Sequence, residues 1–257
     1  MACGLITAWA MFTVIPAPRV NDFSRTACAR AMRVIPVIGL CLGVLAGTAA
    51  ALVGLLGGGR MLAMACGLAV LAMANGCFHL DGLADTADGL GSRKPPQEAL
   101  RIMKKSDIGP MGVAAVVLLL ALEIAAAASP HLSGWRGVWA LVTMPMVART
   151  AAVMATRRGV PCAPTSSLGR LFADLTTPAT MILDMACALV VSAASGWLAF
   201  GARTGIAAAV ACAVAWAVET LWQRHLLARL GGMTGDTFGS LIELTGLSHL
   251  LVLAVAA

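Results

Sequence analysis

Long apolar stretches separated by short polar segments make up most of this chain. Each stretch holds close to the 20 residues that a helix needs to cross the hydrocarbon core of a bilayer. The candidate stretches cover residues 34–56, 61–80, 111–128, 135–155, 181–200, 205–222 and 241–257. The pattern therefore predicts an all-α, polytopic integral membrane helix bundle with about seven transmembrane helices.

The composition agrees with a protein surrounded by membrane lipid. Hydrophobic residues make up 60% of the 257 residues and charged residues 12%, and the mean hydropathy is +0.88. A soluble fold could not bury this much apolar surface. No linker divides the chain, so we expect one membrane-embedded domain over residues 1–257. It contains an interfacial N-terminal segment (1–33), an Asp-rich segment (81–110) and a loop of Gly, Thr and Asp (223–240).

Positive charges are distributed unevenly between the predicted loops. Of the 18 Lys and Arg residues, only Arg60, Arg136 and Arg203 lie in one set of alternating loops, and the other set, to which we assign Arg149, holds the rest. Because cytoplasmic loops carry the excess of Lys and Arg, the N-terminus and the segments 81–110 and 223–240 are predicted to face the cytoplasm. The net charge of +6 does not indicate nucleic-acid binding, because aromatic residues that stack bases do not alternate with the basic ones.

Three carboxylates, which we call the Asp stripe, follow the second apolar stretch. Asp81, Asp85 and Asp88 fall within roughly 60° of one another on a helical face, and no Lys or Arg lies among them. Such oxygen ligands favour Mg²⁺, Mn²⁺ or Ca²⁺, and Mg²⁺ commonly takes one or two carboxylates plus phosphate oxygens from a substrate. The outer two acids are about 10 Å apart along a helix, so Asp85 is expected to be the shared ligand, for one ion or for two.

Small residues next to the Asp stripe fit the same interpretation. Gly82 and Gly89 leave the backbone free of a side chain, as a close approach of a ligand would require. The alternative is that the stripe is only the polar end of a helix that emerges into water.

A second polar segment lies in the last predicted cytoplasmic loop, over residues 231–239. Its glycines, with Thr234 and Thr237, suit a loop that offers backbone amides and hydroxyls to phosphate, although a plain turn would have the same composition. Glu243 follows at the start of the last apolar stretch. Because both segments are predicted on one side of the membrane, they are candidates for one site.

Two histidines near these segments, His79 and His225, are interpreted as hydrogen-bonded residues at helix ends and are left out of the site. Three acids within apolar stretches, Glu123, Asp184 and Glu219, keep open a different class of function. Such residues often mark substrate or ion pathways in transporters. No second copy of the Asp stripe, as an internal repeat would provide, is found.

Three blocks of sequence together resemble the cobalamin synthase family of adenosylcobinamide-GDP ribazoletransferases. The blocks are HLDGLADTADGLG over residues 79–91, ALRIMKKSDIGPMG over 99–112 and GGMTGD over 231–236, supported by PVIG over 36–39 and by Gly169 and Phe172. The resemblance implies a bacterial inner-membrane enzyme that joins adenosylcobinamide-GDP to α-ribazole, or to its 5′-phosphate, and releases GMP with Mg²⁺. It also suggests a homo-oligomer or an association with other enzymes late in cobalamin biosynthesis.

The resemblance further implies roles for individual residues. Asp81, Asp85 and Asp88 would hold the metal, and Asp236 or one Asp of the stripe would act as the base. Arg101 and Lys104 would contact phosphate. Further substrate contacts are expected from Ser106, Thr234 and Glu243.

Val14, Lys105 and Pro164 depart from the family pattern, which favours Arg, Asp and Arg at these positions. Two other functions stay open beside the transferase. One is a membrane enzyme like the CDP-alcohol phosphatidyltransferases, which also carry an Asp cluster but with an Ala-Arg pair near its start, whereas Ala84 precedes Asp85 here. The other is a metabolite or cation transporter.

Overall fold

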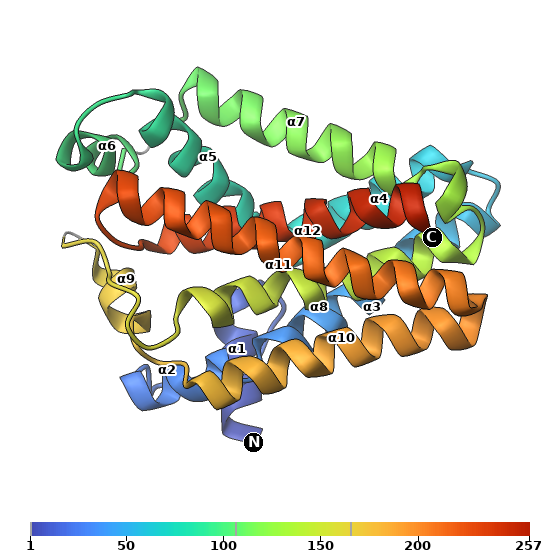
Figure 1. The fold of residues 1–257 in the computed structure, drawn as a ribbon, viewed down its shortest axis with the longest axis horizontal. Coiled ribbons are helices and arrows are strands. Elements are labelled where there is room, and N and C mark those ends of the chain that lie inside the picture. The colour runs from blue at the N-terminus through green and yellow to red at the C-terminus, as the bar shows by residue number, and fades with distance from the viewer. Residues whose placement is uncertain (1, 106, 165) are drawn as a thin grey trace.

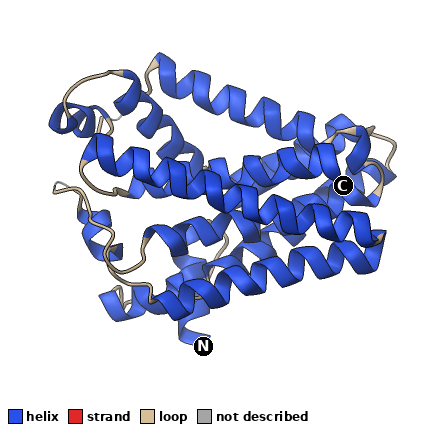
Figure 2. Cartoon of the chain, in the orientation of Figure 1, coloured by secondary structure: helices blue, strands red, loops and turns tan. Residues whose placement is uncertain are grey.

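The structure is a computed structural model that describes residues 2–105, 107–164 and 166–257. Its long helices run roughly antiparallel along the longest axis of the molecule, and short helices cover one end (Figure 1). Within the described residues the regular elements are all helical (Figure 2). They are α1 (Ala2–Phe12), α2 (Arg25–Met32), α3 (Ile35–Leu55), α4 (Arg60–Ala74), α5 (Phe78–Gly91), α6 (Pro96–Ile102), α7 (Pro110–Ala127), η1 (Pro130–Leu132), α8 (Trp135–Ala155), α9 (Ser167–Phe172), α10 (Pro178–Phe200), α11 (Ala202–Leu230) and α12 (Gly235–Ala256).

Six of these helices, α3, α7, α8, α10, α11 and α12, are long and apolar enough to cross a membrane, and α4 with α5 forms a seventh candidate that is sharply bent. The predicted helix bundle with about seven spans is thereby confirmed. Large apolar side chains such as Leu183, Val190 and Leu198 of α10 lie on the outside of the bundle. Such a surface is typical of helices that contact lipid.

The predicted span over 61–80 is not one continuous helix. Helix α4 ends at Ala74 and α5 begins at Phe78, with a bend of 88° between them. The chain turns there because Gly76 and Cys77 adopt positive φ angles of 66° and 58°, which no α-helix accommodates. The 15 residues of α4 extend about 22 Å, so α4 alone is shorter than the ~30 Å hydrocarbon core.

The predicted loop over 223–240 is mostly helical. Helix α11 continues to Leu230 and α12 begins at Gly235, so only residues 231–234 connect them. Gly231 ends α11 in the left-handed conformation, with φ 74°, as is common for a helix C-terminus. Thr234 begins α12 through a capping box with Thr237, which satisfies donors that the first turn leaves unpaired.

Helix α8 forms the centre of the bundle, with nearly all of its span buried. Helix α3 packs directly against it, because a side chain at Gly39 or Gly43 would collide with the carbonyl of Pro145 or Val142. This close approach of two backbones is what glycines at a spacing of four residues permit in membrane helices. Residues of the N-terminal segment, the Asp-rich segment and the α11–α12 connection all lie at one end of the bundle, which we call the Asp end (Figure 1).

Candidate active site

The Asp stripe and Asp236 come together because α5 packs against the first turn of α12. A Cβ at Gly82 would lie only 2.6 Å from the carbonyl oxygen of Asp236, and one at Gly239 only 2.8 Å from that of His79. Glycine at both positions therefore lets the two backbones touch.

The interpretation of Gly82 and Gly89 as sites where a ligand approaches the backbone is wrong, because other parts of the protein fill the space next to both glycines. Gly82 faces the backbone of α12, and Gly89 faces Met103 and the carbonyl of Ala99. Both glycines make room for neighbouring helices. These two glycines next to the Asp stripe thus have the same packing role as Gly39 and Gly43 inside the bundle.

Four carboxylates lie near one another at this contact. Asp81 is exposed, while Asp85, Asp88 and Asp236 are half-buried. The charges of Asp81, Asp88 and Asp236 all act on Asp85, which places Asp85 at the centre of the group, as its sequence position predicts. Among the described residues, no three His, Cys, Asp or Glu side chains are arranged closely enough to form a complete cage for one ion.

Asp88 has a structural role that the sequence did not indicate. Its Oδ2 accepts a hydrogen bond of 2.6 Å from Gly109 N, and its Oδ1 accepts one of 2.8 Å from Gly112 N. These amides belong to the start of α7, where backbone donors have no partner within the helix. Asp88 therefore caps α7 and fixes it to α5; each oxygen keeps a lone pair, so the predicted role as metal ligand stays a prediction.

Basic residues border the carboxylates. The charge of Lys104 acts on Asp236, so this ammonium group lies beside the site. Arg101 and Lys104 also line an open groove of about 400 Å³ together with Lys94 and Lys105. Ser106, a further predicted substrate contact of this segment, lies outside the described residues.

Thr234 is buried and holds the first turn of α12 in place. Its Oγ1 accepts a hydrogen bond from Thr237 N at 3.2 Å and lies 3.4 Å from Asp236 Oδ2. Another segment holds the α11–α12 connection in place: Met233 N donates a hydrogen bond of 2.9 Å to Pro161 O, and Met233 O accepts one of 2.9 Å from Ala163 N. The segment between α8 and α9, which contains Pro161 and Ala163, thus positions Asp236 through the α11–α12 connection.

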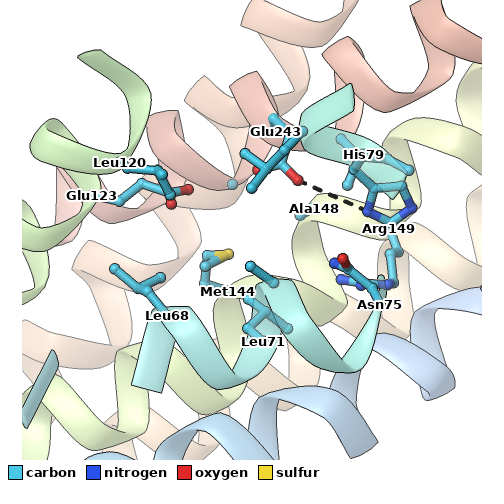
Figure 3. Close-up of a pocket in the computed structure, with 14 residues that line it drawn as sticks. Leu68, Leu71, Asn75, His79, Leu120, Glu123, Met144, Ala148, Arg149 and Glu243 are labelled. Atoms are coloured by element: carbon cyan, nitrogen blue, oxygen red, sulfur yellow. Dashed lines mark ion pairs between the residues drawn. The ribbon is translucent and has the colours of Figure 1, made fainter. Parts of the chain in front are cut away.

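Glu243 does not lie with the Asp stripe. It lies seven positions after Asp236 on α12, about 10 Å along the helix axis. It faces a small internal cavity of about 30 Å³, room for roughly one water molecule. There Glu243 Oε1 lies 3.9 Å from His79 Nδ1, and Arg149, Asn75 and Glu123 point toward the same space (Figure 3).

One residue of this inner cluster, Arg149, was placed wrongly from the sequence. Arg149 was assigned to the cytoplasmic loops, but it lies within α8 and is only 2% exposed, and His79 is buried to the same extent. Arg149 donates a hydrogen bond of 3.1 Å to Pro145 O, while its Nε and Nη2 have no hydrogen-bond partner within the described residues. A charged residue inside an apolar stretch is the signal that could have identified it.

The three acids that suggested a transporter do not form one pathway in the described residues. Glu123 lies near Glu243, Asp184 of α10 is influenced by Arg33, and Glu219 of α11 is influenced by Arg157. Each therefore belongs to a different part of the bundle.

Comparison with known proteins gives consistent matches over nearly the whole chain. A sequence model of the family described as cobalamin-5-phosphate synthase matches residues 4–254. Among curated relatives, a protein of Frankia casuarinae is 36% identical over 97% of this chain and 93% of its own length. One of Geotalea daltonii is 32% identical over 93% and 92%, and one of Roseiflexus sp. is 32% identical over 95% and 87%. All three are named adenosylcobinamide-GDP ribazoletransferase. No solved structure matches the chain significantly.

Proposed function

This chain belongs to the cobalamin-5-phosphate synthase family, and we propose that it joins adenosylcobinamide-GDP to α-ribazole or its 5′-phosphate in a reaction that needs Mg²⁺ at the Asp stripe. The family and the names of the relatives make it an adenosylcobinamide-GDP ribazoletransferase. The observation that carries the metal proposal is the gathering of Asp81, Asp85 and Asp236 where α5 meets α12.

The residues present fit Mg²⁺. Several carboxylates within range of one another repel unless a cation lies among them. The absence of a complete cage among the described residues suits an ion that takes only one or two protein carboxylates and completes its coordination with water and substrate phosphate. We assign Asp81 and Asp85 as its first ligands, with Asp88 contributing while it caps α7. When bound, Mg²⁺ would neutralise charge on the diphosphate and favour departure of GMP.

The side chains have distinct tasks in the proposed transfer. A hydroxyl of the ribazole ribose attacks the phosphorus that carries the cobinamide arm; a new P–O bond forms and the P–O bond to GMP breaks. Asp236, which is half-buried beside the stripe, accepts the hydroxyl proton, with one Asp of the stripe as the alternative base. Lys104, which lies near Asp236, and Arg101 hold the phosphates, as cations matched to the charge of the leaving group.

The site is proposed to face the cytoplasm of a bacterial inner membrane. The Asp end carries the Lys and Arg residues of α2, α6 and the 93–105 segment, whereas Arg60, Arg136 and Arg203 lie at the opposite end. This asymmetry supports the predicted orientation. An amphiphilic corrinoid substrate could then reach the Asp end from the lipid surface or from the cytoplasm.

The test is GMP release by the purified protein given adenosylcobinamide-GDP and α-ribazole, with Mg²⁺ or with EDTA. We expect turnover only with metal, and a loss of about 10²-fold or more in Asp85→Asn, the range seen when one group that stabilises transition-state charge is removed. Asp107→Asn is the matched control, because Asp107 is an exposed carboxylate on the same segment. Undiminished turnover in EDTA, or equal losses in both variants, would refute the metal assignment.

A further inference from the structure

A second cavity lies next to the carboxylates and is not used by any step described above. It has a volume of about 240 Å³ and is lined by parts of α1, α2, α5, α8, α9 and α12. Four of the six Phe residues in the chain, together with two methionines, form most of its wall: Phe12, Phe78, Phe172, Phe238, Met11 and Met32.

The cavity adjoins the candidate active site. Phe78 lies one turn before Asp81 on α5, and Gly235 and Phe238 flank Asp236 on the first turn of α12. Because α5 and α12 touch at Gly82 and Asp236, the wall of the cavity and the carboxylates are built on the same two helix starts. A ligand that filled the cavity would therefore contact residues next to Asp81 and Asp236 along the chain.

The shape and chemistry of the cavity favour a flat aromatic ring. Phe172 and Phe238 lie edge to face at 6.4 Å between ring centroids and 86° between planes, and Phe12 lies 6.3 Å from Phe172. Aromatic rings favour such tilted and edge-to-face contacts, so a further aromatic ring in the cavity would find favourable partners in these Phe side chains. A cavity of about 150 Å³ accommodates benzene, so this larger one has room for two fused rings.

We propose that this cavity binds the aromatic base of the ribazole substrate. The proposal rests on the proposed function and adds where its second substrate lies. With its base among the Phe side chains, ribazole would place its ribose beside α12, so that the attacking hydroxyl faces Asp236. The competing occupant is a lipid acyl chain, which an apolar cavity of a membrane protein could also take.

Two substitutions test the cavity without touching the carboxylates. Phe238→Leu keeps an apolar side chain but removes an aromatic ring from the wall. Ala152→Leu adds bulk at a buried position of α8 that lines the cavity. The matched control is Ala63→Leu, which adds the same bulk to a different cavity, of about 300 Å³, at the opposite end of the bundle.

Binding and turnover are measured separately in detergent. The dissociation constant for α-ribazole is obtained by calorimetry, and KM is obtained for each substrate from GMP release. We expect Phe238→Leu to weaken α-ribazole binding about three- to tenfold, the worth of one aromatic contact, and Ala152→Leu to weaken it by about tenfold or more. The KM for adenosylcobinamide-GDP and all values for Ala63→Leu should stay at the wild-type level.

The outcomes separate this proposal from the proposed function. Wild-type protein that binds α-ribazole but does not release GMP would contradict the proposed reaction, while weaker binding by the two cavity variants would still support the cavity. Wild-type protein that does not bind α-ribazole, or cavity variants with unchanged affinity, would overturn the proposal. Native mass spectrometry that shows a phospholipid lost from Ala152→Leu, with ribazole affinity unchanged, would assign the cavity to lipid. If Ala152→Leu does not fold, Phe238→Leu decides.

Discussion

Two acids of the same stripe, Asp81 and Asp88, have different surroundings. Asp81 is exposed and its carboxylate has no hydrogen bond to the protein among those found in the described residues, whereas both carboxylate oxygens of Asp88 accept backbone hydrogen bonds from the start of α7. The spacing of the three acids predicts that they share a face of α5. It cannot predict that one of them is engaged by another helix, because the partner amides lie more than 20 residues further along the chain.

The role of Asp88 in capping predicts a loss of stability on substitution. Asp88→Ala removes the acceptors of Gly109 N and Gly112 N, and we expect it to lower the free energy of unfolding by about 1–3 kcal/mol. The measurement is thermal unfolding in detergent. Asp81→Asn is the comparison: it should retain wild-type stability while GMP release falls. An Asp88→Ala protein that unfolds at the wild-type temperature would show that the cap contributes nothing.

The inner cluster predicts coupling between Arg149 and Glu243. The charge of Glu243 acts on the buried guanidinium of Arg149, so removal of either charge leaves the other one buried without compensation. We expect Arg149→Met and Glu243→Gln each to destabilise the protein by roughly 3–5 kcal/mol, and the double variant to lose clearly less than the sum. Thermal unfolding of the four proteins gives the coupling energy. Additive losses would mean that the two groups act independently.

The contact between α5 and α12 is the element-level feature on which the site depends. In Gly82→Ala the new Cβ would lie 2.6 Å from the carbonyl oxygen of Asp236, so the helices must separate and Asp85 must move away from Asp236. We expect at least about a tenfold loss of GMP release, as expected when reacting groups are displaced by about an ångström. Gly54→Ala is the control, because its nearest neighbour, Ala63 Cβ, is 4.0 Å away. Equal activity of the two variants would argue against this geometry.

The turn between α4 and α5 aims the Asp stripe, and it gives a second prediction for these helices. Gly76 has φ 66°, and a Cβ there would lie 2.7 Å from Val14 Cγ1. Gly76→Ala should therefore cost about 1 kcal/mol or more of stability and also reduce activity, since the start of α5 moves. Gly57→Ala has a similar φ of 84° with open space around it; unfolding and GMP release should show a loss of stability alone. Full activity in Gly76→Ala would contradict a role of this turn in positioning the stripe.

Apolar length predicts most of the long helices, but not the break within 61–80 or the full extent of α11 and α12. The stretch 135–155 coincides with α8, and 111–128 differs from α7 by one residue at each end, because lipid requires a continuous apolar helix there. The run over 61–80 contains no Pro and only two Gly residues, so its break at Gly76 and Cys77 depends on packing against the N-terminal segment that composition does not reveal. Most of the predicted loop over 223–240 is helical, because Gly231 caps the end of α11 and Thr234 caps the start of α12. A prediction based on polarity alone assigns such capping residues to a loop.

Across the whole molecule, polar chemistry gathers at one end. The Asp stripe, Asp236, the basic groove and the aromatic cavity all lie at the Asp end, while the C-terminus lies at the other (Figure 1). The sequence predicted that the Asp stripe, the basic segment and the loop with Asp236 share one side, since each further span reverses the side of the next loop, but it did not predict the aromatic cavity. It did not predict the inner cluster of His79, Arg149 and Glu243, because residues from three helices meet there only after folding.

The orientation of the bundle gives the last prediction. If the uneven distribution of Lys and Arg between the two ends sets the topology, the Asp end faces the cytoplasm. Single cysteines at Asp107 and Ser133, both exposed and at opposite ends, can be placed in a chain whose eight native cysteines are replaced. A membrane-impermeant maleimide added to spheroplasts should label Ser133→Cys at once and Asp107→Cys only after the membrane is permeabilised. Labelling of Asp107→Cys from outside would show that the topology is the reverse of the predicted one. A nucleotide-linked substrate in the cytoplasm could then not reach the carboxylates.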